Sequence, residues 1–128
     1  MISPDMSSQR LALPKPVRGD VFSARLDPTE GSEQAGTRPV VVVSRDSINA
    51  NSPVVVIVPV TDAANVRRLY PSHAHLAKGS GGLKMESVAK AEQIRAIQVS
   101  RFVAYHGRLD KEVLERLEEA IRITLALR

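Results

Sequence analysis

The chain has 128 residues and a mass of 13.9 kDa, and its 43% hydrophobic and 25% charged residues are typical of one globular domain rather than of a fibrous or disordered chain. It contains no cysteine, which excludes disulfides and thiolate metal sites and predicts a reducing, cytoplasmic location. No apolar run is long enough to cross a bilayer, and 18 basic against 14 acidic residues favour a polyanionic partner such as RNA, DNA or an acidic protein segment.

The chain begins with a segment that has no regular pattern. Residues 1–16 mix Ser, Gln, Pro and isolated apolar residues, which predicts a flexible N-terminal leader. We expect a single domain to span residues 17–128. Its first strand is indicated by the apolar residues within 21–26, and it ends at Asp27-Pro28 because proline cannot donate a hydrogen bond to a neighbouring strand.

A glycine-containing loop and two valine-rich strands come next. The loop covers residues 29–37 and holds no large apolar side chain. The strands are expected at 38–44 and 54–61, and such continuous apolar runs are typical of strands that are buried on both faces. A polar turn is expected between them, over 45–53. Polar residues on a loop held by a packed scaffold often bind or catalyse, so the loop is a candidate functional segment.

The segment 62–84 is polar, basic and rich in glycine. It predicts a strand over 68–76 and a mobile loop elsewhere. Short strands are then expected at 86–93, 94–97 and 102–107. Many short strands separated by turn signals favour a small barrel or sandwich.

The last part of the chain changes to a helical period. Asp110 is a good N-cap, and apolar residues at helical spacing follow as far as Leu125. We therefore predict an amphipathic helix over 110–127, with Glu118 and Arg122 placed to form an ion pair on its surface. Strands followed by one terminal helix make an α+β chain built on a β core.

Three kinds of chemistry find little support in the sequence. His73 and His75 alternate along a strand, but no cysteine, His-x-x-x-His pair or paired aspartates accompany them. No serine lies on a recognisable nucleophile elbow. The glycines of 79–82 followed by Lys84 lack the Gly-Lys-Ser/Thr ending of a phosphate-binding loop and favour a flexible turn. We therefore expect no metal and no cofactor.

Arg38 and Thr61 suit the cleavage of RNA without a metal. RNA supplies its own nucleophile, the 2′-hydroxyl, so an enzyme needs only to move protons and stabilise a five-coordinate phosphorane. A guanidinium is planar, permanently charged and matched to phosphate oxygens. Arg38 lies where the loop enters one valine strand and Thr61 ends the other, so they meet at one rim if these strands are neighbours. For Arg38 the alternative is a surface ion pair.

Short motifs follow one another in a specific order. Arg-Gly-Asp stands at 18–20, Leu-Asp-Pro at 26–28, Gly-Ser-Glu-Gln-Ala-Gly-Thr-Arg-Pro at 31–39 and Glu-Gln-Ile-Arg at 92–95. In content and order they resemble the MazF/PemK family of toxin endoribonucleases. The resemblance implies a small SH3-like β-barrel, of the MazF/CcdB kind, with a packed C-terminal helix.

The resemblance, which extends over roughly residues 17–127, also implies an activity. Such proteins are toxins of type II toxin–antitoxin modules, and they cut single-stranded RNA (mRNA) at short sequences without a metal. The products carry a 2′,3′-cyclic phosphate and a 5′-hydroxyl. The implied partners are a second copy of the chain, in a homodimer, and a cognate MazE-like antitoxin that blocks the RNA groove with an extended acidic segment and binds DNA together with the toxin. No contact with a membrane is implied.

The resemblance assigns roles to residues as well. Arg38 and Thr61 match the two residues implicated in cleavage, and Glu33 matches a loop carboxylate implicated in some members, for which an ion pair within the loop is the alternative. We expect Arg38 to stabilise transition-state charge rather than act as a base, because a guanidinium stays protonated in an exposed groove. Eight further residues are expected to contact RNA: Gln34, Thr37, Arg67, Arg68, Tyr70, Lys78, Lys84 and Gln93.

Some of these residues have structural interpretations. Gln93 is expected to satisfy backbone groups across the barrel, and the basic residues of 67–84 would otherwise form a solvated loop. Arg18 and Asp20 are expected to be architectural. Aromatic content is only 3%, so few side chains are available to stack on bases.

Two other functions stay open. The same barrel serves CcdB-like inhibitors of DNA gyrase, which would depend on the end of the C-terminal helix rather than on Arg38 and Thr61. A noncatalytic nucleic-acid-binding barrel would use its positive charge alone. Loss of function in Arg38→Ala with unchanged RNA affinity would separate an enzyme from a binding protein.

Overall fold

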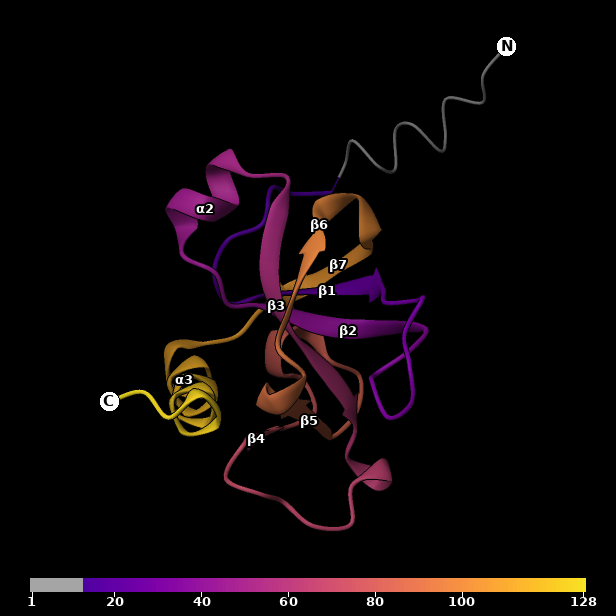
Figure 1. Ribbon diagram of the computed structural model, residues 1–128, viewed down its shortest axis with the longest axis vertical. Helices are drawn as coiled ribbons and strands as arrows, with labels where there is room; N and C mark the ends of the chain where they lie inside the picture. The colour runs from indigo at the N-terminus through magenta and orange to yellow at the C-terminus, as the bar shows by residue number, and fades with distance from the viewer. Residues whose placement is uncertain (1–12) are drawn as a thin grey trace.

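The structure is a computed structural model that describes residues 13–128, so residues 1–12 of the predicted leader lie outside the described residues. Within 13–128, seven strands form one antiparallel sheet in the order β4-β5-β3-β2-β1-β7, and β6 pairs separately with β3 (Figure 1). The C-terminal helix α3 lies beside the sheet (Figure 1). No helix of this part of the chain has both the length and the apolar character needed to cross a membrane.

Three consecutive strands form the centre of the sheet. They are β1 (Asp20–Arg25), β2 (Thr37–Val42) and β3 (Val54–Asp62), and each pairs antiparallel with the next. All three were predicted within a few residues. The valines of β2 confirm the expected burial on both faces, because Val41 belongs to one hydrophobic cluster and its neighbours Val40 and Val42 belong to another.

Four shorter strands complete the sheet: β4 (His73–Leu76), β5 (Ser87–Lys90), β6 (Arg95–Gln98) and β7 (Phe102–Arg108). The long strand β3 is shared between two of them, since its first half pairs with β6 and its last three residues pair with β5. The change of partner occurs around Pro59, which has no N–H to donate. Strand β3 therefore links β6 at its start to β5 at the end where Thr61 lies.

The predicted strands of the central segment were too long. The strand expected at 68–76 is confined to β4, and the one expected at 86–93 ends at Lys90, where a 3₁₀ turn (Ala91–Gln93) begins. Further 3₁₀ turns cover Ala63–Asn65, Ser80–Gly82 and Val99–Arg101. These turns connect successive strands, and local alternation of apolar residues does not reveal them.

The predicted α+β fold class is confirmed, with one qualification on closure. The described strands leave β4 and β7 at opposite ends of the sheet order, so the sheet is not closed on itself. The word barrel therefore describes it only approximately. Two hydrophobic clusters fill the two faces, and Phe22 stacks on Phe102 at 4.3 Å between ring centroids within the second cluster.

The C-terminal helix α3 (Lys111–Leu125) matches the predicted helix within two residues at each end. The Asp110 side chain accepts a hydrogen bond from the Val113 N–H at 3.2 Å, as expected of an N-cap. The buried stripe consists of Val113, Leu117 and Ala120, which pack on the first cluster. Leu125 was expected in this stripe and is instead 47% exposed.

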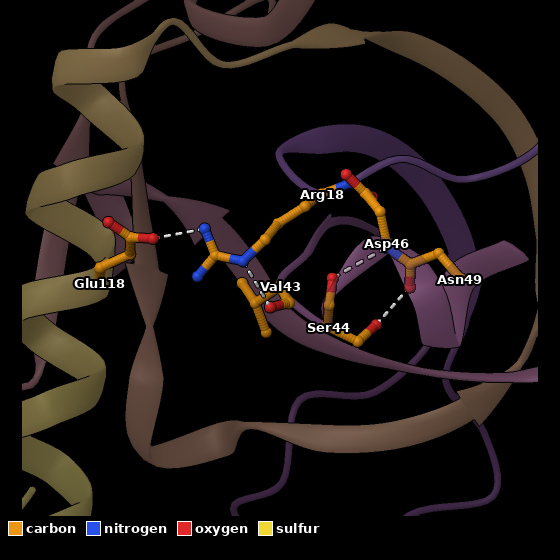
Figure 2. A network of polar contacts seen from close by, with 6 residues as sticks. All are labelled: Arg18, Val43, Ser44, Asp46, Asn49 and Glu118. Atoms are coloured by element: carbon orange, nitrogen blue, oxygen red, sulfur yellow. Dashed lines mark hydrogen bonds and ion pairs between the residues drawn. The ribbon is translucent and has the colours of Figure 1, made fainter.

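The polar segment between β2 and β3 is a short helix, α2 (Asp46–Asn51), where a polar turn was expected over 45–53. Its N-terminus has no side-chain cap, so tertiary contacts hold it. Asn49 is buried, donates to the Ser44 carbonyl at 2.8 Å and accepts from the Ser44 hydroxyl at 2.5 Å (Figure 2). Asp46 accepts a hydrogen bond from the Arg18 N–H at 2.8 Å.

Arg18 connects this region to α3. Its guanidinium pairs with Glu118 and donates from Nε to the Val43 carbonyl at 3.1 Å (Figure 2). The predicted pair of Glu118 with Arg122 is therefore wrong, and Arg122 pairs with Glu119 instead. Buried Asp20 accepts hydrogen bonds from the Val17 N–H and from Arg108, both at 2.8 Å. The expected architectural roles of Arg18 and Asp20 are confirmed.

Candidate functional site: a cavity at the shared end of β2 and β3

A cavity of about 310 Å³ opens where β2, β3 and β7 meet the segment that precedes β5. Arg38 and Thr61 both line it, so the two residues that were predicted to meet do so. Strand pairing explains their proximity. The register of β2 and β3 pairs Val40 with Pro59, and continuing that register by two residues brings Arg38 opposite Thr61.

Arg38 is held by its own loop. Its Nε donates to the Ala35 carbonyl at 2.7 Å, and the residue is half-buried. Within residues 13–128 the two terminal nitrogens of its guanidinium make no hydrogen bond, and Arg38 forms no ion pair with a carboxylate. Within these residues Arg38 therefore does not form the surface ion pair that was its alternative interpretation. The guanidinium has donors left for an oxyanion.

Thr61 is 4% exposed and presents its hydroxyl at the end of β3. The Asn65 amide donates to Thr61 Oγ1 at 3.4 Å, a long hydrogen bond. Thr37, at the start of β2, and Lys84, just before β5, line the same cavity and are exposed. The cavity therefore combines a fixed guanidinium, a hydroxyl and a solvated lysine, which suit a phosphodiester.

Glu33 lies outside the lining of this cavity. It lines a second hollow of about 440 Å³ together with Gln34 and Gln93. Its carboxylate accepts a hydrogen bond from the Glu30 N–H at 2.6 Å, so it stabilises a turn within the loop. The Gln34 N–H donates to Gln93 Oε1 at 3.4 Å, which is the structural role expected of Gln93. The structure thus separates these three predicted residues from Arg38 and Thr61.

The other predicted RNA-binding residues lie on exposed turns. Arg67, Arg68 and Tyr70 belong to the segment before β4, and all three are exposed. The rings of Tyr70 and His73 form a T-shaped pair with 5.5 Å between their centroids. Lys78 donates its backbone N–H to Glu86 at 2.6 Å. This hydrogen bond lowers the pKa of Glu86 below its ordinary value.

The two histidines of β4 have different carboxylate partners. His73 Nε2 lies 3.2 Å from Glu92, and His75 Nε2 lies 2.9 Å from Glu86. Among residues 13–128, no three His, Asp or Glu side chains gather as metal ligands.

The glycine turn before Lys84 was expected to be flexible, and its packing corrects this prediction. Gly81 is buried, and a Cβ atom there would lie 2.5 Å from Val21 Cγ2. A Cβ on Gly82 would lie 2.1 Å from the His106 carbonyl oxygen. The glycines therefore allow the turn to pack directly on β1 and β7, and the turn forms one wall of the cavity.

Sequence reasoning missed several polar residues of the cavity, among them Ser23 and His106. Ser23 of β1 and His106 of β7 both line it, and Ser23 Oγ lies 2.6 Å from His106 Nε2. The two residues are 83 positions apart in the chain. No local motif marks either of them, and only the pairing of β1 with β7 brings them together.

Comparison with known proteins identifies the family of the chain. Residues 17–125 match the family described as the PemK-like, MazF-like toxin of type II toxin–antitoxin systems. The chain is 38% identical over 110 residues to endoribonuclease EndoA of Bacillus subtilis, a match that covers 86% of this chain and 94% of that protein. It is also 38% identical over 115 residues to endoribonuclease MazF9 of Mycobacterium tuberculosis, covering 86% and 96%.

Solved structures share the fold at lower identity. MazF from Deinococcus radiodurans superposes with a TM-score of 0.76 at 23% identity, covering 90% of this chain and 100% of that one. A mycobacterial endoribonuclease in complex with its cognate antitoxin gives a TM-score of 0.73 at 21% identity, covering 88% and 97%. The chain belongs to the PemK-like, MazF-like toxins of type II toxin–antitoxin systems, the family of the endoribonucleases it resembles.

Proposed function

We propose that this chain is the toxin of a toxin–antitoxin module and that it cuts single-stranded RNA, at short specific sequences and without a metal. The products are a 2′,3′-cyclic phosphate and a 5′-hydroxyl. The observation that carries the proposal is the placement of Arg38 and Thr61 in one cavity, where the terminal guanidinium nitrogens of Arg38 make no hydrogen bond within residues 13–128. Membership of a family whose curated relatives are named endoribonucleases supports it.

The roles of the residues follow from this geometry. Arg38 donates to the non-bridging oxygens of the phosphorane, where negative charge develops. Thr61 orients the phosphate or the 2′-hydroxyl through its own hydroxyl. Glu33 acts through the loop rather than on the substrate, since its carboxylate holds the turn from which Ala35 binds Arg38.

RNA reaches this cavity along a basic surface. Lys84 and Thr37 contact the nucleotide beside the scissile phosphate, because they line the same cavity. Gln34 and Gln93 contact the next nucleotide in the second hollow. The exposed residues Arg67, Arg68, Tyr70 and Lys78 contact the strand farther away.

The assembly and location belong to the same proposal. The toxin acts in the cytoplasm as a homodimer, with residues 17–128 as one domain that follows an N-terminal leader. A MazE-like antitoxin inhibits it by laying an acidic segment along the basic surface, and the pair binds DNA. A solved relative in complex with its cognate antitoxin supports this partner.

The test is the cleavage of a long, defined RNA by purified protein in EDTA, with analysis of the fragment ends. Discrete cuts that carry a cyclic phosphate and a 5′-hydroxyl are the expected result. The Arg38→Ala protein, purified in the same way, controls for contaminating ribonucleases and should not cut. Intact RNA after incubation with folded, antitoxin-free protein would overturn the proposal and favour gyrase inhibition or simple binding.

A further inference from the structure

The cavity holds a second polar pair besides Arg38 and Thr61. His106 Nε2 and Ser23 Oγ are 2.6 Å apart, and both residues are half-buried in the cavity lining. The cleavage step needs a group that removes the proton from the 2′-hydroxyl. Neither the guanidinium of Arg38 nor the hydroxyl of Thr61 accepts a proton readily at neutral pH, whereas a neutral imidazole does.

A β-bulge directs His106 toward the cavity. In the pairing of β1 with β7, Val21 faces Gly107 and Phe22 faces Tyr105, so His106 is an extra residue with no partner in the register. Bulges of this kind redirect a side chain, and they occur frequently next to active sites. The position of His106 is therefore a consequence of an interruption in the ladder, not of ordinary alternation.

The bulge is held in place by the glycine turn. A Cβ on Gly82 would lie 2.1 Å from the His106 carbonyl oxygen, and a Cβ on Gly107 would lie 3.0 Å from backbone atoms of Gly81. The backbones of the two segments thus lie against each other at the His106 carbonyl and at Gly107. This contact fixes the imidazole against the cavity, which is what a residue that moves protons requires.

Two charged groups near His106 already have partners. Asp62 of β3 caps the turn that follows it by accepting the Ala64 N–H at 2.9 Å. Arg108 of β7 pairs with Asp20. The remaining ionisable groups that share the cavity, or lie beside His106 on its own strand, are Arg38 of β2, Lys84 before β5 and Tyr105 of β7. His106 contributes the one imidazole among these groups, and its Nδ1 makes no hydrogen bond within residues 13–128.

We propose that His106 is the general base of the cleavage reaction and that Ser23 positions it. The Nε2–H donates to Ser23 Oγ, which fixes the tautomer and leaves the lone pair on Nδ1. Nδ1 has no hydrogen-bond partner within residues 13–128. This inference rests on the proposed ribonuclease function and adds a proton acceptor to it.

The step balances as follows. The 2′-O–H bond breaks and its proton moves to Nδ1 of His106, while the 2′-oxygen forms a bond to phosphorus. The bond from phosphorus to the 5′-oxygen breaks, and that oxygen takes a proton from water. The imidazolium then returns its proton to solvent, so the products are the cyclic phosphate and the 5′-hydroxyl and the enzyme is unchanged.

The experiment measures single-turnover cleavage between pH 5 and 9, together with RNA affinity, for wild-type protein and three variants. His106→Gln keeps a donor for Ser23 and lacks the base. We expect its rate to fall by about 10²-fold or more with unchanged RNA affinity. The wild-type rate should rise with pH through the range where imidazoles titrate, and the variant should lose this rise. His75→Gln, which removes a histidine outside the cavity, is the matched control.

His106→Ala provides a readout that a structural role would not give. Free imidazole in the buffer should restore part of its activity, in proportion to the concentration of the neutral form. Ser23→Ala should lower the rate less than His106→Gln does and keep the pH dependence. If wild-type protein cuts RNA and His106→Gln matches its rate and pH profile, His106 is not the base while the ribonuclease proposal stands. If wild-type protein does not cut, both proposals fail.

Discussion

Arg18 and Glu118, 100 residues apart in the chain, form an ion pair that fastens the C-terminal helix α3 to the start of the sheet (Figure 2). The two side chains are 31% and 26% exposed. Arg18 also binds the Val43 carbonyl and, through its backbone, Asp46. One arginine therefore connects α3, the end of β2 and α2.

The first prediction concerns the contribution of this ion pair to stability. Glu118→Gln should lower the free energy of unfolding by about 1 kcal/mol or less, because a partly exposed pair gains little over solvation by water. The measurement is urea unfolding at low and high salt, with a smaller difference expected at high salt. Glu119→Gln breaks the exposed pair with Arg122 and should have a weaker effect. Equal effects of the two variants would show that Arg18 does not fasten α3.

The second prediction concerns acid stability through Asp46. The hydrogen bond from the Arg18 N–H, and then that from the Asn49 amide, hold the pKa of Asp46 below its ordinary value of 3.8. A carboxyl whose pKa is lowered on folding contributes stability that is present above its unfolded pKa and is lost as the pH falls through the folded value. The stabilising contribution of Asp46 should therefore be lost below about pH 4.

The variant Asp46→Asn removes this carboxyl. Its stability should fall less steeply than that of wild-type protein between pH 4 and pH 2, as measured by urea midpoints at each pH. Glu115→Gln, which removes one exposed carboxyl of α3, controls for the change in net charge. Parallel curves for wild-type protein and Asp46→Asn would contradict the assigned hydrogen bonds.

The third prediction separates the two residues of the proposed cleavage site. Arg38→Lys should keep the fold and lower the cleavage rate by about 10²-fold, since a lysine cannot reproduce the planar fork of donors toward the phosphorane. Thr61→Val keeps the shape of the buried side chain and removes only the hydroxyl. We expect it to lower the rate with little change in thermal stability, and single-turnover kinetics with a melting curve check both variants. Full activity of Arg38→Lys would remove Arg38 from the mechanism.

The fourth prediction concerns the exposed basic segment before β4. Replacing Arg67 and Arg68 together by alanine should weaken the binding of all single-stranded RNAs similarly. Each lost phosphate contact reduces the slope of log affinity against log salt by about 0.7, so the pair should reduce it by about 1.4. The double variant Lys111→Ala, Arg116→Ala removes the same charge from α3 and should leave the slope nearly unchanged. Equal slopes for all three proteins would mean that Arg67 and Arg68 are only solvated charges.

Local sequence signals predicted most elements of the fold. The valine runs of β2 and β3 and the N-cap Asp110 of α3 were sufficient, because they act over a few neighbouring residues. The same reasoning missed α2, whose six residues are too few to be stable alone and are held by contacts of Asn49 and Asp46 with Ser44 and Arg18. It also predicted a local ion pair between Glu118 and Arg122, whereas Glu118 pairs with Arg18 from the other end of the chain.

In the candidate site, too, local sequence signals predicted some residues and tertiary contacts decided others. A short motif led to Arg38, and the end of a valine strand led to Thr61. The sequence by itself thus determined the strands, the terminal helix and the family to which the chain belongs. Only the tertiary structure decided that Glu33 lies in another hollow, that the glycines of 79–82 pack tightly, and that Ser23 meets His106. These contacts depend on strand register and on one bulge, and register arises from pairing between distant segments, which no local pattern records.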